Sequence, residues 1–206
     1  MPDSASHQTD LAETRLIEGR QCGTCDVCCV TLTIDDPRLK KVQGYRCPHL
    51  KPSQGCSIYE TRPQTCRNFY CGWRQLKWVR ESLRPDRSGV LVELAGEIDP
   101  DGTRRLGVAF TLLNRAALKA EGLAETVAAA VSAQVPVFLT IPGPPGYTSA
   151  RAKINAYLEH AVAAKDKSAV LTLLAQAQRK GQRGDRRRIV LTGKADAKQS
   201  IVLERS

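Results

Sequence analysis

The sequence predicts an α+β fold, in which a loop-rich cysteine module is followed by a small mixed region of strands and helices. All eight cysteines lie in the first third of the 206 residues, between Cys22 and Cys71. Prolines and glycines interrupt the same segment, whereas helical and alternating apolar patterns follow it. We expect four parts: an N-terminal tail and short helix (1–19), the cysteine module (20–84), an α+β region (85–194) and a flexible C-terminal tail (195–206).

The first part is expected to contain one short helix. Its first eight residues have the polar composition of a disordered tail. Asp10 is placed to cap a helix over 10–18, with Glu13 at the reciprocal position and Gly19 at its end.

The cysteine module is expected to have little regular structure of its own. Only residues 30–34 alternate like a short strand. Residues 72–81 have helical spacing, and we expect this helix to cover the module with Trp73 and Trp78 packed in the core.

The rest of the chain alternates strand and helix patterns. Residues 89–94 and 105–110 flank a polar Asp-Pro-Asp-Gly turn and predict a β-hairpin. The further elements expected are a helix at 115–133, a strand at 135–141, helices at 150–164 and 166–179, and a short strand at 188–191.

The cysteine spacing predicts a metal site. Thiolates are soft ligands, which bind zinc, iron–sulfur clusters or Cu(I) better than they bind magnesium or calcium. A module with so few large apolar residues is expected to be metal-stabilised, because metal binding then supplies its folding energy. The candidate ligands are Cys22, Cys25, Cys28, Cys29, Cys47, Cys56, Cys66 and Cys71.

The adjacent pair Cys28 and Cys29 bears on the number of sites. Neighbouring side chains diverge from an extended backbone, so one tetrahedral ion would bind both only in a strained turn. The thiols divide more readily between two four-ligand sites, or between one cluster and several accessory thiols.

Other residues between the cysteines suit the surroundings of a thiolate site. His49 is a candidate ligand or a donor to one. Arg62 and Arg67 suit the negative charge of thiolates, although Tyr59, Glu60 and Arg62 equally suit an ordinary structural network. Apolar shielding is expected from Ile58, Tyr59 and Phe69.

The sequence contains no apolar run of 18 residues, and its first residues lack the pattern of a secretory signal. We therefore expect a cytoplasmic protein with no membrane partner. Reducing cytosol favours metal-bound over disulfide-bonded cysteines. A disulfide framework is the alternative, because the cysteine count is even.

Basic residues gather near the C-terminus of a chain whose net charge is +10. Such a stretch suits phosphate or an acidic protein, or it forms a solvated loop. Nucleic-acid binding is not expected, because no aromatic side chains lie among these residues for base stacking. The stretch contains Arg179, Lys180, Arg183, Arg186, Arg187 and Arg188.

A longer motif surrounds the cysteines. Cys-x2-Cys-x2-Cys-Cys is followed by Cys47-Pro48-His49-Leu50 and then by Cys-x-Ile-Tyr-x2-Arg-Pro-x2-Cys-Arg-x-Phe, which begins at Cys56. Over residues 20–75 the chain thus resembles the bacterial YkgJ-like cysteine-cluster family. The resemblance implies a domain that chelates zinc or iron and is related to flagellin lysine N-methylase. It also implies that the first seven cysteines are ligands, whereas Cys71 joins them by proximity.

Taken together, these features predict a metal-binding protein that holds zinc or an iron–sulfur cluster in an accessory or structural role. The α+β region is expected to dock a protein partner. The alternative is an iron–sulfur-dependent, protein-modifying enzyme related to flagellin lysine N-methylase. No catalytic residue is assigned, because the sequence shows neither a glycine-rich S-adenosylmethionine loop after a strand nor a Cys-x3-Cys-x2-Cys signature.

Overall fold

A four-stranded mixed sheet forms the centre of the computed structural model, which describes residues 16–192 and 199–204. β5 (Val90–Ile98) and β6 (Arg104–Leu112) form an antiparallel hairpin. β7 (Val137–Ile141) runs parallel to β6, and β8 (Ala150–Lys153) runs antiparallel to β7. The predicted α+β class and the predicted hairpin are confirmed.

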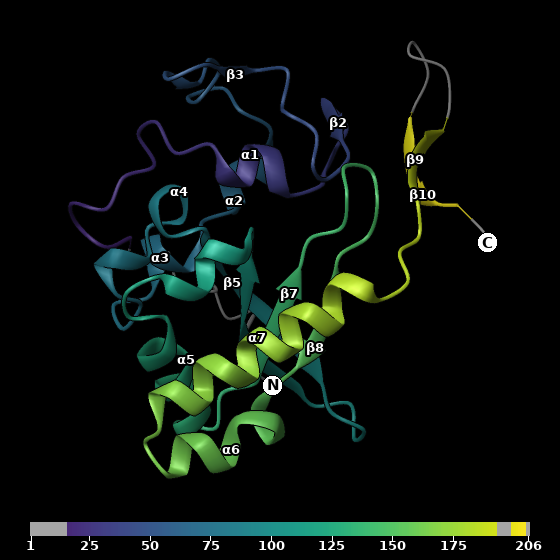
Figure 1. The fold of residues 1–206 in the computed structure, drawn as a ribbon. Helices are drawn as coiled ribbons and strands as arrows, with labels where there is room; N and C mark the ends of the chain where they lie inside the picture. The colour runs from purple at the N-terminus through teal and green to yellow at the C-terminus, as the bar shows by residue number, and fades with distance from the viewer. Residues whose placement is uncertain (1–15, 193–198, 205–206) are drawn as a thin grey trace, which may run out of the picture.

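Two helices, α5 (Leu123–Ser132) and α7 (Lys167–Arg183), pack against this sheet. A third, α6 (Asn155–Ala163), packs against both of them (Figure 1). Alternation along each strand sends one set of side chains toward the helices. Val92, Phe110 and Leu139 lie in register across three strands, and all three are buried in the main core.

The cysteine module lies above one end of the sheet in Figure 1. It has its own small core, in which Ile34, Leu39, Cys47 and Leu50 are buried. Its elements are α1 (Val27–Thr31), β1 (Ile34–Asp36), β2 (Leu39–Lys41), β3 (Leu50–Lys51), β4 (Gly55–Cys56) and α2 (Gln64–Asn68).

The connection between the module and the sheet corrects one prediction. Instead of one helix over 72–81, the chain forms α3 (Gly72–Gln75), a 3-10 turn (Glu81–Leu83) and α4 (Pro85–Ser88). Trp73 packs in the main core as predicted. The same prediction for Trp78 is wrong, because 41% of that side chain's surface is exposed.

Other helix and strand boundaries differ from the predicted ones for local reasons. Residues 30–34 are not a strand, because α1 continues to Thr31 and β1 begins at Ile34. The helix expected over 115–133 is a 3-10 helix (Arg115–Lys119) followed by α5, with the break at Gly122, whose φ is +81°. Only Gly adopts such a backbone easily.

The segment 150–164 divides because its first residues pair with β7 as strand β8, which leaves α6 to begin at Asn155. The helix expected over 10–18 and the tail over 1–8 fall mostly outside the described residues, and 16–18 are not helical. The predicted strand 135–141 and helix 166–179 are confirmed as β7 and α7.

A second hairpin projects beside the module at the right of Figure 1. It consists of β9 (Ile189–Thr192), which confirms the expected last strand, and β10 (Ser200–Leu203). β10 lies within the stretch 195–206 that we expected to be a tail.

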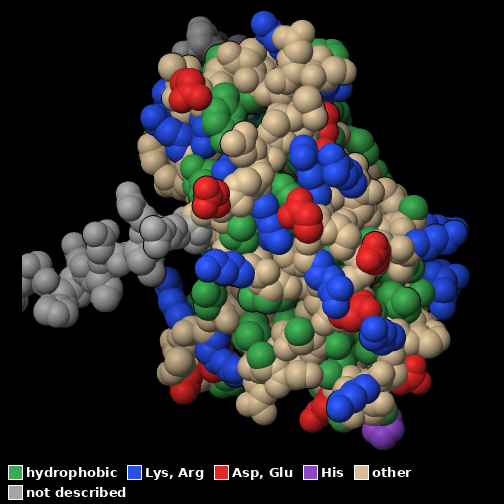
Figure 2. Space-filling model, turned by 90° about the vertical axis from the view of Figure 1, so that its left-hand side faces the viewer, with side chains coloured by type: hydrophobic (Ala, Val, Ile, Leu, Met, Phe, Trp, Pro, Cys, Tyr) green, Lys and Arg blue, Asp and Glu red, His purple; other side chains and the backbone are tan. Residues whose placement is uncertain are grey.

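Basic and acidic side chains are interspersed over the face seen in Figure 2, which is the left-hand side of Figure 1. Mixed charge of this kind gives no strong field of one sign. Within the described part of the chain, no helix is long and apolar enough to span a membrane.

Glu93 on β5 gives the sheet a testable pH dependence. Burial raises the pKa of its carboxyl group, although the Thr111 hydroxyl donates a hydrogen bond to Oε2 at 3.1 Å. A raised folded-state pKa means that ionised Glu93 destabilises the fold at neutral pH, and that this cost disappears as the pH falls through the folded-state pKa. Glu93→Gln should therefore raise the unfolding free energy at pH 7 by on the order of 1 kcal/mol.

Urea unfolding of the Glu93→Gln variant at pH 7 and at pH 4 tests this expectation, with Glu159→Gln at an exposed position of α6 as the matched control. The gain should shrink at the lower pH. Equal stability of wild type and variant at both pH values would contradict it.

Candidate metal centre

Seven of the eight cysteines line one cavity of about 140 Å³ in the cysteine module. Apolar and aromatic side chains complete its wall, including Ile58, Tyr59 and Phe69, as predicted from the sequence. His49 also lines the cavity, and Cys71 lies outside its lining. The lining cysteines are Cys22, Cys25, Cys28, Cys29, Cys47, Cys56 and Cys66.

One group of thiols gathers around Cys22. A tight turn brings Cys25 back toward it, since the Cys25 amide donates to the Cys22 carbonyl at 2.9 Å. Burial, together with the negative charges of Asp86 and Cys22, raises the pKa of Cys25 to about 11. Negative charge on Cys22 likewise raises the pKa values of Cys28 and Cys71. Cys22, Cys25, Cys28 and Cys71 are therefore electrostatic neighbours, which we call the first thiol group.

A second group gathers around Cys47. The Cys47 amide donates to the Cys29 carbonyl at 3.1 Å, and the β3–β4 pair places Cys56 opposite Leu50. Burial raises the pKa of Cys66, and charges on Cys29, Cys47 and Cys56 raise it further. We call Cys29, Cys47, Cys56 and Cys66 the second thiol group.

Cys28 and Cys29 join the two groups. Both belong to helix α1 rather than to an extended segment, and successive residues of a helix point in different directions. Cys28 lies near Cys22 and Cys25 and also near Lys41, whereas Cys29 lies near Lys41 and Arg62, and a hydrogen bond links the two cysteine side chains at the boundary between the groups. Hydrogen bonding from Cys28 lowers the pKa of Cys29 to about 7, so the Cys29 sulfur is the one that ionises more easily.

A buried arginine accompanies the first thiol group. Arg74 on α3 is 8% exposed, and its Nη1 lies 3.6 Å from the Cys22 sulfur and 3.5 Å from the Tyr59 hydroxyl oxygen. Its Nε donates to the Arg20 carbonyl at 2.8 Å. No carboxylate of the described residues forms an ion pair with Arg74. Because buried charges are normally paired, the neighbouring Cys22 sulfur is the candidate counter-charge of Arg74.

A buried lysine accompanies the second thiol group. Lys41 on β2 is 4% exposed, and its ammonium group donates to the carbonyls of Val30, Val42 and Tyr45 at 3.0 to 3.3 Å. Burial lowers the pKa of Lys41, and negative charge on Cys47 and Cys29 opposes that effect. In the described part of the chain, Lys41 too lacks an ion-paired carboxylate.

Arg62 adds a second cation to this group. Its charge lowers the pKa values of Cys29 and Cys66. The same guanidinium donates to the Tyr59 carbonyl at 2.7 Å and lies 3.9 Å from the centre of the Tyr59 ring. Arg62 can thus both offset the charge of thiolates and belong to a structural network with Tyr59, the two roles considered from the sequence. Arg67, by contrast, is exposed and contributes to neither group.

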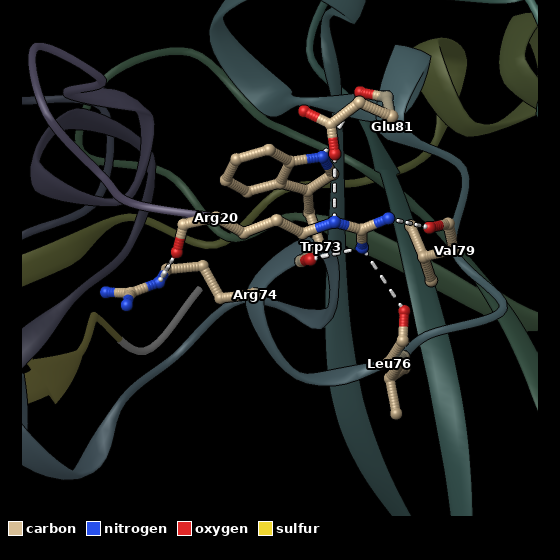
Figure 3. Close-up of polar contacts among 6 residues, drawn as sticks. All are labelled: Arg20, Trp73, Arg74, Leu76, Val79 and Glu81. Atoms are coloured by element: carbon tan, nitrogen blue, oxygen red, sulfur yellow. Dashed lines mark hydrogen bonds and ion pairs between the residues drawn. The ribbon is translucent and has the colours of Figure 1, made fainter. Parts of the chain in front are cut away.

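Arg20 anchors the chain segment that leads into the first thiol group (Figure 3). Its guanidinium points into a ring of carbonyls and donates to Trp73 at 2.6 Å, Leu76 at 3.4 Å and Val79 at 2.9 Å. Its Nε also pairs with Glu81 at 2.9 Å. Two of these carbonyls, those of Trp73 and Leu76, are acceptors that a continuous helix over 72–81 would have used. Arg20 therefore both ends α3 and positions the backbone two residues before Cys22.

The thiol donors suit a soft metal, but their sulfur atoms do not converge on one coordination centre. In residues 16–192 and 199–204, no three His, Cys, Asp or Glu side chains converge closely enough to hold a metal ion as they stand. None of the eight cysteines forms a disulfide. Metal binding would therefore require the seven lining thiols to turn toward the shared cavity, and Cys71, outside its lining, to move toward Cys22.

Local sequence signals identified the thiols, His49 and Arg62, but missed the cations that reach them from elsewhere. Lys41 and Arg74 lie in no cysteine motif, and Arg84 was also unforeseen. The Arg84 guanidinium donates to the Cys22 carbonyl at 3.0 Å. A basic residue at an unremarkable position carries no signal of this kind, because only the folded chain shows what lies beside it.

No family model, no curated protein and no solved structure matches this chain.

Proposed function

We propose that this protein binds zinc or an iron–sulfur cluster through two tetrathiolate groups, in an accessory or structural role. The first group is Cys22, Cys25, Cys28 and Cys71, and the second is Cys29, Cys47, Cys56 and Cys66. The observation that carries the proposal is the pair of buried cations, Arg74 and Lys41, one beside each group and neither ion-paired to a described carboxylate.

Charge balance explains why such cations belong there. Four thiolates around a divalent ion leave two negative charges, which are costly to bury alone. Arg74 and Arg84 lie beside the first group, and Lys41 and Arg62 beside the second. In a protein with eight neutral thiols, Arg74 and Lys41 would be buried without counter-charges.

The protein's own residues would do three things for the metal. The thiols would supply its ligands, and the basic side chains would offset the charge of the thiolates. Ile58, Tyr59 and Phe69 would restrict the access of water, which tunes the electronics of thiolate sites. The resemblance to a zinc- or iron-chelating family points in the same direction.

Substitution of single cysteines tests the division into two groups. Cys71→Ser and Cys56→Ser should each lose about half of the bound metal, because each removes one ligand from a different group. The double variant should lose nearly all of it. Elemental analysis of protein purified without oxygen gives the result, and Ser53→Ala, on the loop between β3 and β4, is the control.

If either single variant lost all of its metal while remaining folded, one multinuclear centre would replace the two groups. Full metal content in both variants would contradict the assignment of these cysteines as ligands.

A further inference from the structure

We infer that the groove between the cysteine module and the C-terminal hairpin binds single-stranded nucleic acid. The groove has a volume of about 600 Å³, and among the residues that the structure describes its lining contains no acidic side chain. The residues that matter most are the exposed Tyr45 and Tyr147 and the basic Arg46 and Arg188, whereas Lys40, which also lines the groove, is ion-paired with Asp35.

Three segments distant in sequence build the groove. The turn before β8 donates from the Gly146 amide to the Gln43 carbonyl at 3.0 Å, which ties it to the module. On its other side, the Ile189 amide donates to the Gly146 carbonyl at 2.7 Å, which ties it to β9. Lys41 fixes the module wall, since its ammonium group donates to the Tyr45 carbonyl at 3.0 Å. The groove is therefore a part of the folded structure.

The two tyrosines come from different segments and meet at the turn that contains Gly146. A side chain at Gly146 would meet the Tyr45 ring at 3.3 Å, so that ring packs directly over the glycine, and Tyr147 is the next residue. Their exposed fractions are 55% for Tyr45 and 37% for Tyr147. Exposed aromatic rings in a basic groove are the stacking platforms that bind unpaired bases without sequence preference.

Two cations of the groove, Arg46 and Arg188, are available to phosphate. Arg46 and Arg188 have only loose partners, Asp26 at 4.0 Å and Glu204 at 3.7 Å, and about half of each guanidinium side chain is exposed. Arg187, next to the groove, is also exposed. A net charge of +10 adds long-range attraction for a polyanion. The interspersed charges of the face in Figure 2 offer no comparable surface.

This inference reverses the expectation from the sequence. The arginine stretch 179–188 contains no aromatic residue, which argued against nucleic acid. The fold supplies the missing rings from residues 45 and 147, because Tyr147 pairs with Arg188 as an isolated β-bridge. The inference rests on the groove alone and does not depend on the metal.

Fluorescence anisotropy of the full chain, as purified, tests the groove with labelled 12-nucleotide oligouridine and oligothymidine. Tyr45→Leu and Tyr147→Leu should each weaken binding about tenfold. Arg46→Gln and Arg188→Gln should each reduce the slope of log affinity against log salt by about 0.7. Tighter binding of the RNA or of the DNA identifies the preferred strand.

The matched controls are Tyr157→Leu on α6, whose ring is 46% exposed, and Arg104→Gln on β6. Both should bind like wild type. Circular dichroism shows whether each variant folds. If Tyr45→Leu does not fold, the binding data of Tyr147→Leu and Arg188→Gln are sufficient to test the groove. Control variants as weak as the groove variants would overturn the inference. Unchanged binding in the tyrosine variants would also overturn the inference. So would competition by polyglutamate that is as effective as competition by unlabelled oligonucleotide.

Discussion

Removing the metal should unfold the cysteine module while the four-stranded sheet stays folded. The module's own core is small, with four buried apolar residues, whereas the sheet and its helices share a much larger one. A structural thiolate site contributes about 10–16 kcal/mol of apparent binding energy in small zinc modules, and that energy is folding energy. Chelation should therefore expose the module's backbone and leave the sheet protected.

Hydrogen exchange with and without a strong chelator measures this difference. The amides of Cys47 and Ser57, which donate to Cys29 and His49 within the module, should exchange at least about a hundredfold faster after chelation. The amide of Val108, which donates to Pro136 beside the sheet, should be unaffected. Excess metal should restore protection, and a calcium-selective chelator serves as the control. Unchanged exchange at Cys47 and Ser57 would show that the module folds without metal.

The second large effect is expected at Arg20. Replacing it by methionine keeps the apolar stem but leaves the carbonyl groups of Trp73 and Val79 without their donor, and it removes one of the two donors to the Leu76 carbonyl, which still accepts from the Val79 amide at 3.0 Å. Hydrogen bonds of this charged kind contribute about 1.5–3 kcal/mol, and an unsatisfied buried acceptor is costly. Arg20→Met should lower the unfolding free energy by about 3 kcal/mol, which corresponds to a melting temperature lower by roughly 6 to 12 °C.

Thermal unfolding of the metal-loaded protein gives this value. Arg87→Met is the matched control, because Arg87 is exposed on α4 and should tolerate the change. Arg20→Lys should fall between the two, since an ammonium group reaches fewer of the carbonyls at once. A melting temperature of Arg20→Met equal to that of the control would refute the structural role of this network.

The parts of the fold that the sequence predicted well are those decided by local patterns. The β5–β6 hairpin follows from a polar turn between two strand patterns, and α7 follows from an apolar stripe with Asp166 at its start, where its carboxylate accepts from the Ala169 amide at 2.9 Å. The errors lie where distant residues decide. Residues 72–81 fail to form one helix because Arg20 takes their carbonyls, and 150–153 form an edge strand because β7 offers a partner.

The same distinction applies to the candidate site. The eight thiols were predictable because their spacing is a property of the sequence. Their two groups were not, because the division depends on how α1 directs Cys28 and Cys29. The buried cations were also beyond prediction, since Lys41 and Arg74 look like ordinary surface residues until the chain folds around them.

Metal content of the wild-type protein, purified without oxygen and measured per chain together with its visible spectrum, tests the central proposal most directly. We expect zinc at about two equivalents, or iron with acid-labile sulfide and a brown colour. A folded, colourless and metal-free protein with eight reactive thiols would contradict the proposal, because Arg74 and Lys41 would then be buried beside neutral sulfur.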